Sequence, residues 1–166
     1  MFTAKRTSLG FTLLELLVTL ALFAVLATIA VPNFSRIIQE NRVITAANEF
    51  KTGLSFARSE ALKRNRSISL LPAPNGWSAG WSAGWEEGGR RTTLRTWPQS
   101  RASITITGAP DQFTFNSQGR LVTPTFIAPH VSITLDERGR CVRVEPSGMA
   151  RVIANRQACP QHNVEL

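Results

Sequence analysis

The sequence predicts an α+β protein in which a long N-terminal α-helix packs against a β-rich head of antiparallel sheets. Two observations carry this prediction. An apolar run from Phe11 to Val31 leads into a helical pattern that continues to about residue 66, and the pattern then changes to the two-residue period of β-strands. The 166 residues therefore divide into four segments: 1–10, 11–32, 33–66 and 67–166.

The apolar run begins directly after a short basic leader. The leader contains Lys5 and Arg6 and ends at Gly10, and no Ala-x-Ala cleavage pattern follows the run before Pro32. This order differs from that of a secretory signal peptide, whose apolar stretch is removed. The run holds 21 residues, close to the ~20 that a helix needs to cross a bilayer. Cleavage after Gly10 would thus leave a chain that begins with a transmembrane helix over 11–32.

Glu15 is the single charged residue of the apolar run. An ionised carboxylate at membrane depth costs on the order of several kcal/mol unless it finds a partner. Cleavage after Gly10 creates such a partner, the α-amino group of Phe11. If similar helices lie side by side with an axial offset, Glu15 of one can pair with the amine of the next, and we predict that this pair sets the register of an assembly. The alternative is an ordinary signal anchor whose Glu15 reaches the lipid headgroups.

The second half of the helix, over 33–66, is predicted to be amphipathic. Pro32 precedes it, and because proline removes one backbone hydrogen bond and crowds the preceding turn, we expect a kink or local loosening there. Beyond it, apolar residues recur at spacings of three and four, which place them on one stripe. They are Val43, Ala47, Phe50, Leu54, Ala57 and Ala61.

Segments with β-forming residues and a period of two follow, separated by Gly, Pro, Asn and Asp. We predict strands over 67–71, 93–97, 102–106, 112–115, 131–135, 141–145 and 150–154. They are expected to form two small antiparallel sheets on the helix. Gly119 is predicted to adopt a positive φ, and residues 119–130 to form a crossover or loop.

The composition bears on compartment and chemistry. The formal net charge is +8, and sixteen of the nineteen basic residues are Arg, which suits a polyanionic partner; a GC-rich genome that encodes basic positions as Arg is the alternative. Cys141 and Cys159 are the two cysteines, and outside the cytoplasm we expect a disulfide that contributes roughly 3 kcal/mol; two free thiols are the alternative. No metal-ligand spacing or catalytic motif is present, so we predict a protein without cofactor, metal or enzymatic activity.

The N-terminal motif, Gly10-Phe11-Thr12-Leu13-Leu14-Glu15 with Pro32 closing the run, resembles the class III leader and first helix of type IV pilins and pseudopilins. FARSEALKRN at 56–65 and FTFNSQGRL at 113–121 resemble the GspH/FimT branch of that family. The resemblance implies that a prepilin peptidase removes segment 1–10 and methylates the amine of Phe11. It also implies a single pass through the inner membrane, a periplasmic head, and assembly with other major and minor pilins or pseudopilins.

A repeat, GWSAGWSAGW at 76–85, places three tryptophans four residues apart: Trp77, Trp81 and Trp85. On an extended strand they share one face, and packing in the core or a hairpin is the common use of Trp. Because the GspH/FimT branch commonly has a Trp and Gly hairpin here, one repeat unit is interpreted as a local duplication. The alternative is a platform that stacks nucleotide bases beside the arginines at 90, 91 and 95.

Some FimT-like minor pilins bind DNA through a C-terminal G-R-x-R motif. Here Gly148-Met149-Ala150-Arg151 keeps the Gly and the last Arg but has Met at the first Arg position. The candidate DNA-binding residues are Arg138, Arg140, Arg143, Arg151 and Arg156. Arg140 and Arg143 point to opposite faces of a strand, so a strand cannot gather the set, whereas a loop pinned by the disulfide could. Ordinary solvated strand charges are the alternative.

We therefore predict a minor type IV pilin, a structural subunit for pilus assembly in twitching motility, adhesion or DNA uptake. Two alternatives stay open. One is a DNA-binding receptor in natural transformation, and the other is a minor pseudopilin of a type II secretion system.

Overall fold

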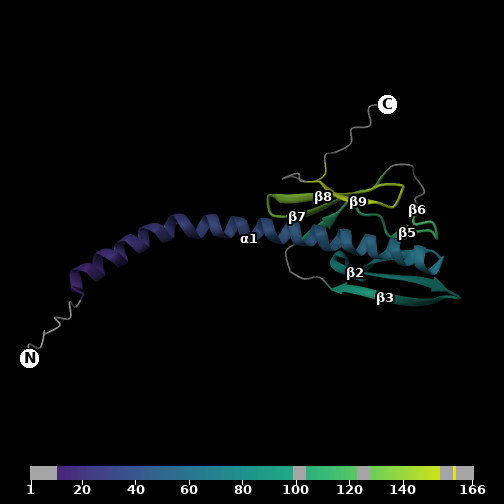
Figure 1. Cartoon of the computed structure of the whole chain (residues 1–166), viewed down its shortest axis with the longest axis horizontal. Helices are drawn as coiled ribbons and strands as arrows, with labels where there is room; N and C mark the ends of the chain where they lie inside the picture. Colours follow the sequence, from purple (N-terminus) through teal and green to yellow (C-terminus); the bar gives the residue numbers. More distant parts are fainter. Residues whose placement is uncertain (1–10, 99–103, 123–127, 154–158, 160–166) are drawn as a thin grey trace, which may run out of the picture. The chain divides into compact units, whose positions relative to one another are not determined.

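A computed structural model of the protein describes residues 11–98, 104–122, 128–153 and 159, and for residues 29–33 it describes the backbone alone. Within this part of the chain, one helix, α1 (Leu13–Arg64), precedes nine strands (Figure 1). The strands are β1 (Ile68–Ala73), β2 (Gly76–Glu87), β3 (Arg90–Pro98), β4 (Thr105–Thr107), β5 (Phe113–Phe115), β6 (Leu121–Val122), β7 (His130–Leu135), β8 (Arg138–Val144) and β9 (Ala150–Ile153). The chain forms two compact units, Met1–Ile38 and Gln39–Leu166, and α1 begins in the first and ends in the second, which we call the head.

In the first unit, Thr12 caps the start of α1. Its Oγ1 accepts a hydrogen bond from the Glu15 backbone N at 3.2 Å, and its carbonyl oxygen accepts one from Leu16 N at 3.2 Å. Thr-x-x-Glu is the sequence pattern of a capping box, and a carboxylate in the first turn also interacts favourably with the helix dipole. Among the described residues the Glu15 carboxylate makes no hydrogen bond to this cap, so its local role at the helix start is the interaction with the dipole.

The membrane span predicted over 11–32 is not confirmed by the described part of α1. Over the residues with described side chains, α1 has no stretch that is both long and apolar enough to qualify as a membrane-crossing helix. The side chain of Pro32 lies outside the described part, and its predicted kink stays a prediction.

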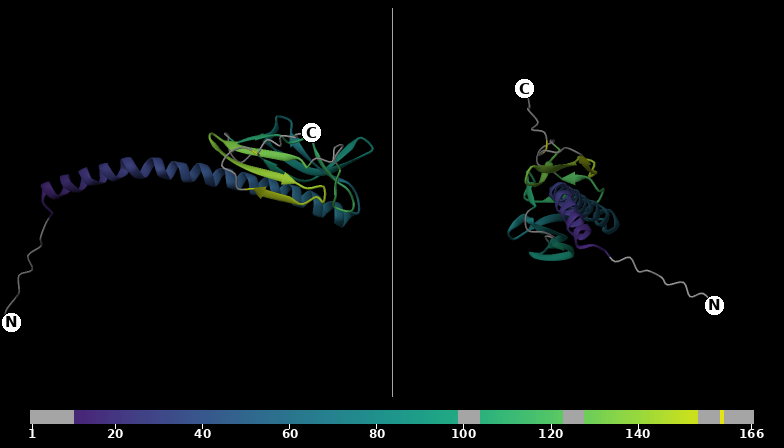
Figure 2. Two further views of the ribbon diagram at one scale, coloured as in Figure 1. Left: turned by 90° about the horizontal axis from the view of Figure 1, so that it is seen from above. Right: turned by 90° about the vertical axis from the view of Figure 1, so that its left-hand side faces the viewer.

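In the head, the strands form two antiparallel sheets, as predicted. The five-stranded sheet has the order β3-β2-β1-β5-β6, and the four-stranded sheet has the order β4-β7-β8-β9. Strands β7 to β9 lie on one side of the C-terminal half of α1, and β2 and β3 lie on the other (Figures 1 and 2). This half of the helix is therefore packed between the two sheets.

The head core is built on the predicted helical stripe. All six stripe residues, Val43 to Ala61, are fully buried. Phe50 is at its centre and makes edge-on ring contacts with Trp77, Trp81 and Phe113 at centroid distances of 5.5, 5.2 and 5.9 Å. Each such side chain contributes about 1.5–3 kcal/mol when it is fully buried. The core is completed by residues from both sheets: Ile68, Leu70, Phe115, Val131, Ile133, Val142 and Val144.

The tryptophan repeat forms β2, and its first two tryptophans are in the core, as the packing interpretation predicts. Trp77 is 8% exposed and Trp81 is 5% exposed. The pairing with β1 shifts here: Ala73 pairs with Gly76, but Pro72 pairs with Trp81 rather than with Trp77. Four residues, 77–80, are therefore inserted in β2, which is the length of one repeat unit, as a local duplication would produce.

The inserted residues connect the two sheets. Ser78 Oγ accepts a hydrogen bond from Ile106 N of β4 at 2.9 Å, and Trp77 Nε1 donates one to the carbonyl oxygen of Pro110 at 2.9 Å. An insertion in a strand leaves backbone and side chains free to make contacts outside the regular ladder. The extra repeat unit thus has a structural role within the head.

Several element bounds differ from the prediction, and the structure explains two of these differences; residues 102, 103 and 154 of the predicted strands lie outside the described part. The helix ends at Arg64 rather than 66, because Asn65 adopts a positive φ of 49° and Arg66 N donates to Ala61 O at 3.3 Å, the arrangement of a Schellman cap. Residues 119–130 are not all loop, since β6 pairs with β5 there; a two-residue strand is too short to give a periodic signal. Gly119 has the predicted positive φ, 71°.

Candidate functional site

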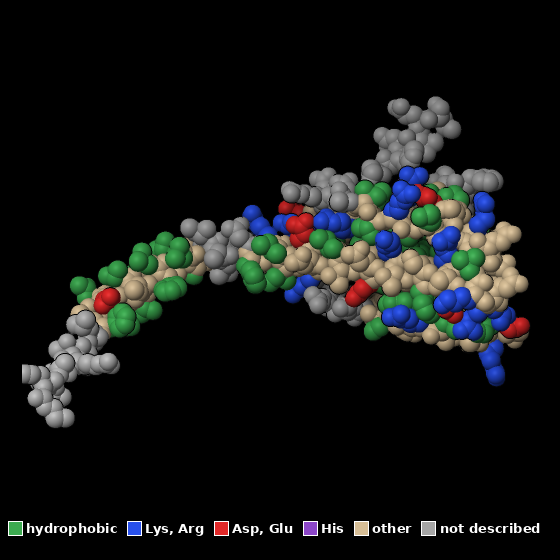
Figure 3. All heavy atoms as spheres, viewed as in Figure 1, with side chains coloured by type: hydrophobic (Ala, Val, Ile, Leu, Met, Phe, Trp, Pro, Cys, Tyr) green, Lys and Arg blue, Asp and Glu red, His purple; other side chains and the backbone are tan. Residues whose placement is uncertain are grey.

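The first candidate site is the apolar surface of the first unit. Every Leu, Val and Phe between residues 11 and 28 is more than half exposed, from 51% at Val18 to 83% at Phe11. Figure 3 shows these green side chains along the N-terminal part of α1. A helix that is apolar on all sides is normally buried in a larger assembly or in lipid, and soluble monomers rarely expose such a continuous surface. This surface therefore requires a partner that covers it.

Glu15 is in the first turn of this surface. Its backbone N is used by the cap at Thr12, and within the described part of the chain its carboxylate has no ion pair or hydrogen bond. The carboxylate is therefore available to a cation outside the described residues. Gly10, where cleavage is predicted, lies outside those residues.

The second candidate site is the predicted arginine set, and the strands divide it between two faces. Arg138 Nη1 lies 3.1 Å from Glu40 Oε2, and Arg140 Nη2 lies 2.9 Å from Glu40 Oε1. Arg140 also donates from Nη1 to Gly139 O at 2.8 Å, and its side chain is 12% exposed. Glu40 thus holds both guanidinium groups against α1, which makes Arg138 and Arg140 part of the head packing.

Arg143 and Arg151 are on the other face of the four-stranded sheet. In the strand register, Arg143 of β8 is opposite Arg151 of β9 and, on its other side, opposite His130 of β7. Both arginines are exposed, and Arg151 Nε lies 3.5 Å from Glu145 Oε1. The predicted opposition of Arg140 and Arg143 is therefore present, and the set is not gathered in one place. Arg156 lies outside the described residues.

The predicted disulfide between Cys141 and Cys159 is present, with a Cα–Cα distance of 4.8 Å. Cys141 is on β8, on the same face as Arg143, and is fully buried. Cys159 N donates a hydrogen bond to Ser132 Oγ of β7 at 3.0 Å. The disulfide and this hydrogen bond therefore hold Cys159 on the outer face of the four-stranded sheet.

The tryptophans of the repeat do not form a stacking platform. Trp77 and Trp81 are buried, and the ring of Trp85 is covered by the guanidinium groups of Arg66 and Arg64, at 4.7 and 5.4 Å from its centroid. Arg66 also donates to Glu87 Oε2 at 2.9 Å, and this hydrogen bond holds the pKa of Glu87 below its usual value. The ring faces are thus used within the protein, and the base-stacking alternative is not supported.

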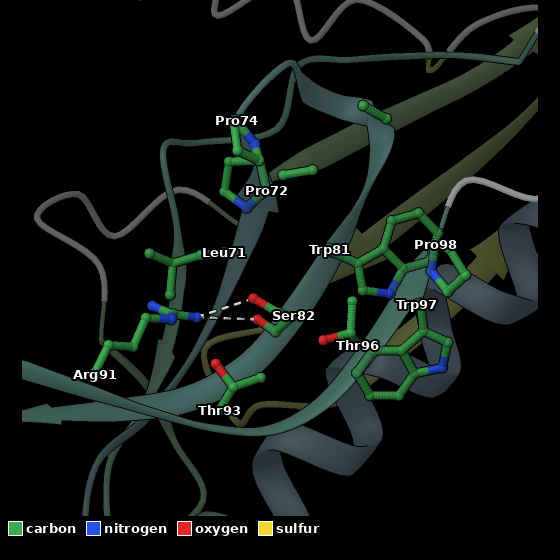
Figure 4. Close-up of a pocket in the computed structure, with 12 residues that line it drawn as sticks. Leu71, Pro72, Pro74, Trp81, Ser82, Arg91, Thr93, Thr96, Trp97 and Pro98 are labelled. Atoms are coloured by element: carbon green, nitrogen blue, oxygen red, sulfur yellow. Dashed lines mark hydrogen bonds between the residues drawn. The ribbon is translucent and has the colours of Figure 1, made fainter.

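A groove of about 440 Å³ lies on the five-stranded sheet, where β1, β2 and β3 meet (Figure 4). Three prolines and two tryptophans are among its lining residues, and Arg91 Nη2 donates to Ser82 Oγ at 3.1 Å across it. The Trp97 ring in its wall packs edge-on against Phe56, with the Arg95 guanidinium 4.8 Å from its centroid. The groove is apolar and its one charged lining residue, Arg91, is engaged by Ser82.

Glu40 is the residue that sequence reasoning missed. It is separated from Arg138 by 98 positions and from Arg140 by 100, so no local spacing links them. In the sequence, Glu40 is an acidic residue near the predicted start of the amphipathic half of the helix. Such a residue by itself indicates a solvated helix face. Among the described residues, no three His, Cys, Asp or Glu side chains are grouped in a way that would hold a metal ion.

Comparison with known proteins gives two family matches. Residues 46–148 match the family described as type II transport protein GspH, and residues 5–31 match the prokaryotic N-terminal methylation motif. The first match covers the C-terminal part of α1 and most of the strands. The second covers the leader and the apolar run. Among curated proteins, no significant match to this chain is found.

Solved structures similar to the chain include two of the type IV minor pilin FimU of Pseudomonas aeruginosa strain PAO1. In space group P21, that protein aligns with a TM-score of 0.62 and 29% identity over 73% of this chain and 94% of its own. In space group P65, the values are 0.58 and 28%, over 70% of this chain and 96% of that one. These similarities confirm the predicted fold class.

Proposed function

The chain belongs to the GspH family of pilin-like proteins, and from this membership we propose that it is a minor type IV pilin, a structural subunit that takes part in pilus assembly. The similarity to FimU, which covers almost all of that minor pilin, supports this choice. The head folds around its own core, so it does not need the first unit to bury its apolar residues. The first unit is then the part that joins the chain to other subunits.

The observation that carries the proposal is the exposed apolar surface of the first unit with its one available carboxylate. Burial of about ten such side chains between neighbouring helices supplies cohesion, because each contributes about 1.5–3 kcal/mol when fully buried. Cleavage after Gly10 and methylation of Phe11 give an amine at the start of this surface. The Glu15 carboxylate of one subunit pairs with that amine in the next and sets the axial register.

We place the precursor in the inner membrane, with a single pass over 11–32 and the head in the periplasm, before it enters the pilus. The methylation-motif match over residues 5–31 supports this location, since that motif includes the apolar run. The disulfide between Cys141 and Cys159 supports an oxidising compartment for the head. The prepilin peptidase is the processing partner in this account.

Two substitutions at Glu15 test the register role. Glu15→Ala removes the carboxylate, and Glu15→Gln removes the charge but keeps a side chain compatible with the cap at Thr12. We expect both variants at normal levels in the membrane fraction and both depleted from sheared pili, measured by immunoblot. Glu86→Gln, at an exposed head position, is the matched control and should enter pili normally. Normal incorporation of Glu15→Gln would contradict the register role of the Glu15 charge.

A second candidate is a minor pseudopilin of a type II secretion system. The family description itself, type II transport protein GspH, favours it. The two roles predict different deletion phenotypes: loss of piliation or twitching for a pilin, and loss of exoprotein secretion with intact pili for a pseudopilin. A role as a DNA receptor has less support, because Glu40 engages Arg138 and Arg140. Of the candidate arginines that the structure describes, only Arg143 and Arg151 share an exposed face.

A further inference from the structure

A second groove of the head, about 350 Å³ in volume, has a different character from the apolar groove on the five-stranded sheet. It lies between α1 and the turn that joins β8 to β9. We call it the basic groove. Its lining residues are Lys51, Ser55, Arg58, Ser59 and Leu62 of α1, together with residues 148–151.

The charges of the basic groove are poorly balanced. Among the described residues, Lys51 has no ion pair, and the Arg58 guanidinium has one hydrogen bond, from Nε to Gly119 O at 3.0 Å, and no carboxylate partner. Arg151 has Glu145 at 3.5 Å, and Glu145 does not line the groove. Three cations therefore line one concave surface that contains no acid, and such a surface attracts an anion.

Arg58 is fixed in place by two glycines. Gly119 and Gly148 both have positive φ, 71° and 82°. A Cβ at Gly148 would overlap the carbonyl oxygen of Gly119 and lie 3.0 Å from Arg58 Nε. The two turns can thus approach each other closely because both positions are Gly, and the Gly119 carbonyl is held where it accepts the Arg58 hydrogen bond. A cation that is already fixed in place binds an anion at a lower entropic cost than a free surface side chain does.

The apolar lining residues indicate which kind of anion fits. Leu62 and Met149 are 48% and 46% exposed at the groove, next to the cations. Arg and Met beside an apolar side chain is a composition typical of protein interfaces. A phosphate backbone has no apolar groups that could pack against Leu62 and Met149. A protein segment that supplies an acidic side chain also supplies apolar side chains, and these can pack against both residues. The groove is also compact, unlike the extended basic track that follows a nucleic acid strand.

We propose that the basic groove binds an Asp or Glu side chain of a neighbouring pilin subunit, with Lys51, Arg58 and Arg151 as its charge partners and Leu62 and Met149 as its apolar contacts. The proposal rests on the proposed function, because a filament is what brings a neighbouring head to this surface. It gives the head a second contact with the assembly, separate from the apolar surface of the first unit.

The test uses the full-length chain in its own cells, with a photo-crosslinking residue at Leu62. We expect crosslinking to an acidic segment of another pilin, and Lys51→Glu and Arg151→Glu should each lower the crosslinked fraction by about tenfold. Lys51→Gln should give a smaller loss. Arg90→Glu, an exposed arginine outside the groove, is the matched control and should leave crosslinking unchanged. Formation of the Cys141–Cys159 disulfide, seen as gel mobility without reductant, verifies that each variant folds.

A charge reversal in the partner, in which the acidic residue near the crosslink is replaced by Lys, should restore crosslinking of the Lys51→Glu variant. If the protein enters pili but Leu62 crosslinks to no pilin, or the groove variants crosslink normally, the basic groove proposal is wrong and the pilin proposal stands. If Leu62 crosslinks instead to DNA, and Lys51→Glu abolishes this, the ligand is a nucleic acid and the proposal is overturned. If the unmodified protein is absent from pili while type II secretion requires it, the pilin proposal fails, and with it the named partner.

Discussion

The two units of the chain differ in how far their apolar helix residues are buried. In the head, the helical stripe from Val43 to Ala61 is fully buried between two sheets, whereas in the first unit every Leu, Val and Phe up to residue 28 is more than half exposed. One helix, α1, thus contains a segment that is completed by its own chain and a segment that is not. The difference indicates that the head is a self-sufficient fold and that the first unit is completed by an assembly.

The largest expected effect on stability is a difference between substitutions at two phenylalanines of this helix. Phe50→Ala should lower the free energy of unfolding of the head by about 3–5 kcal/mol, because it removes a buried ring that contacts Trp77, Trp81 and Phe113. Phe23→Ala should leave that free energy unchanged, since Phe23 is exposed. Urea unfolding of the full chain in detergent, followed by tryptophan fluorescence, measures both. Equal effects of the two substitutions would contradict the comparison.

Removal of the Glu40 carboxylate should have the next largest effect. Glu40→Gln leaves the mostly buried Arg140 guanidinium without its carboxylate partner, and we expect a loss of about 1–3 kcal/mol in the same unfolding experiment. Glu86→Gln, at an exposed position, is the control and should change little. A stability equal to that of the unmodified protein would mean that the contacts of Arg138 and Arg140 with Glu40 do not hold the head together.

A smaller effect is expected at Gly53, where the helix packs closely on the five-stranded sheet. A Cβ there would lie 2.6 Å from Trp81 Nε1, so Gly53→Ala must displace a buried indole. Overpacking costs about 1–3 kcal/mol and the gain in helix propensity is about 1 kcal/mol, so the net loss should be on the order of 1 kcal/mol. Ser55→Ala, an exposed position on the same helix, should be neutral or slightly stabilising. A gain in stability for Gly53→Ala would show that the contact is loose.

The smallest effect concerns pH and the end of the helix. The hydrogen bond from Arg66 lowers the pKa of Glu87, so this pair stabilises the head when pH is above the ordinary carboxyl range. That contribution is lost as pH falls through the lowered pKa, and Arg66→Gln should remove it. The thermal stability of the variant should therefore be lower than that of the unmodified protein at neutral pH, and this difference should become smaller at acidic pH. An identical difference at both pH values would contradict this assignment.

Local patterns in the sequence were sufficient for the features that depend on local spacing. The stripe from Val43 to Ala61 follows the helix period, so its burial was predictable, and the positive φ of Gly119 followed from its turn position. Contacts between distant segments were not predictable in this way. Glu40 is about a hundred positions from Arg140, and the hydrogen bond from Ile106 N to Ser78 Oγ joins β2 to a strand of the other sheet.

The candidate sites also differ in whether they depend on neighbouring or on distant residues. The N-terminal motif could be interpreted from sequence because its residues act as neighbours along one helix. The arginine set could not, because whether an arginine is available depends on what the fold places opposite it. Arg138 and Arg140 have an acid from α1 opposite them, while Lys51 and Arg58, which the sequence did not single out, are on a groove without one.

We propose that the apolar surface of the first unit is retained in the mature protein and becomes its assembly surface. Intact-protein mass spectrometry of the chain purified from sheared pili tests this most directly. We predict a mature protein that begins at a methylated Phe11. A protein that retains Met1, or one whose N-terminus lies beyond Val31, would contradict the account.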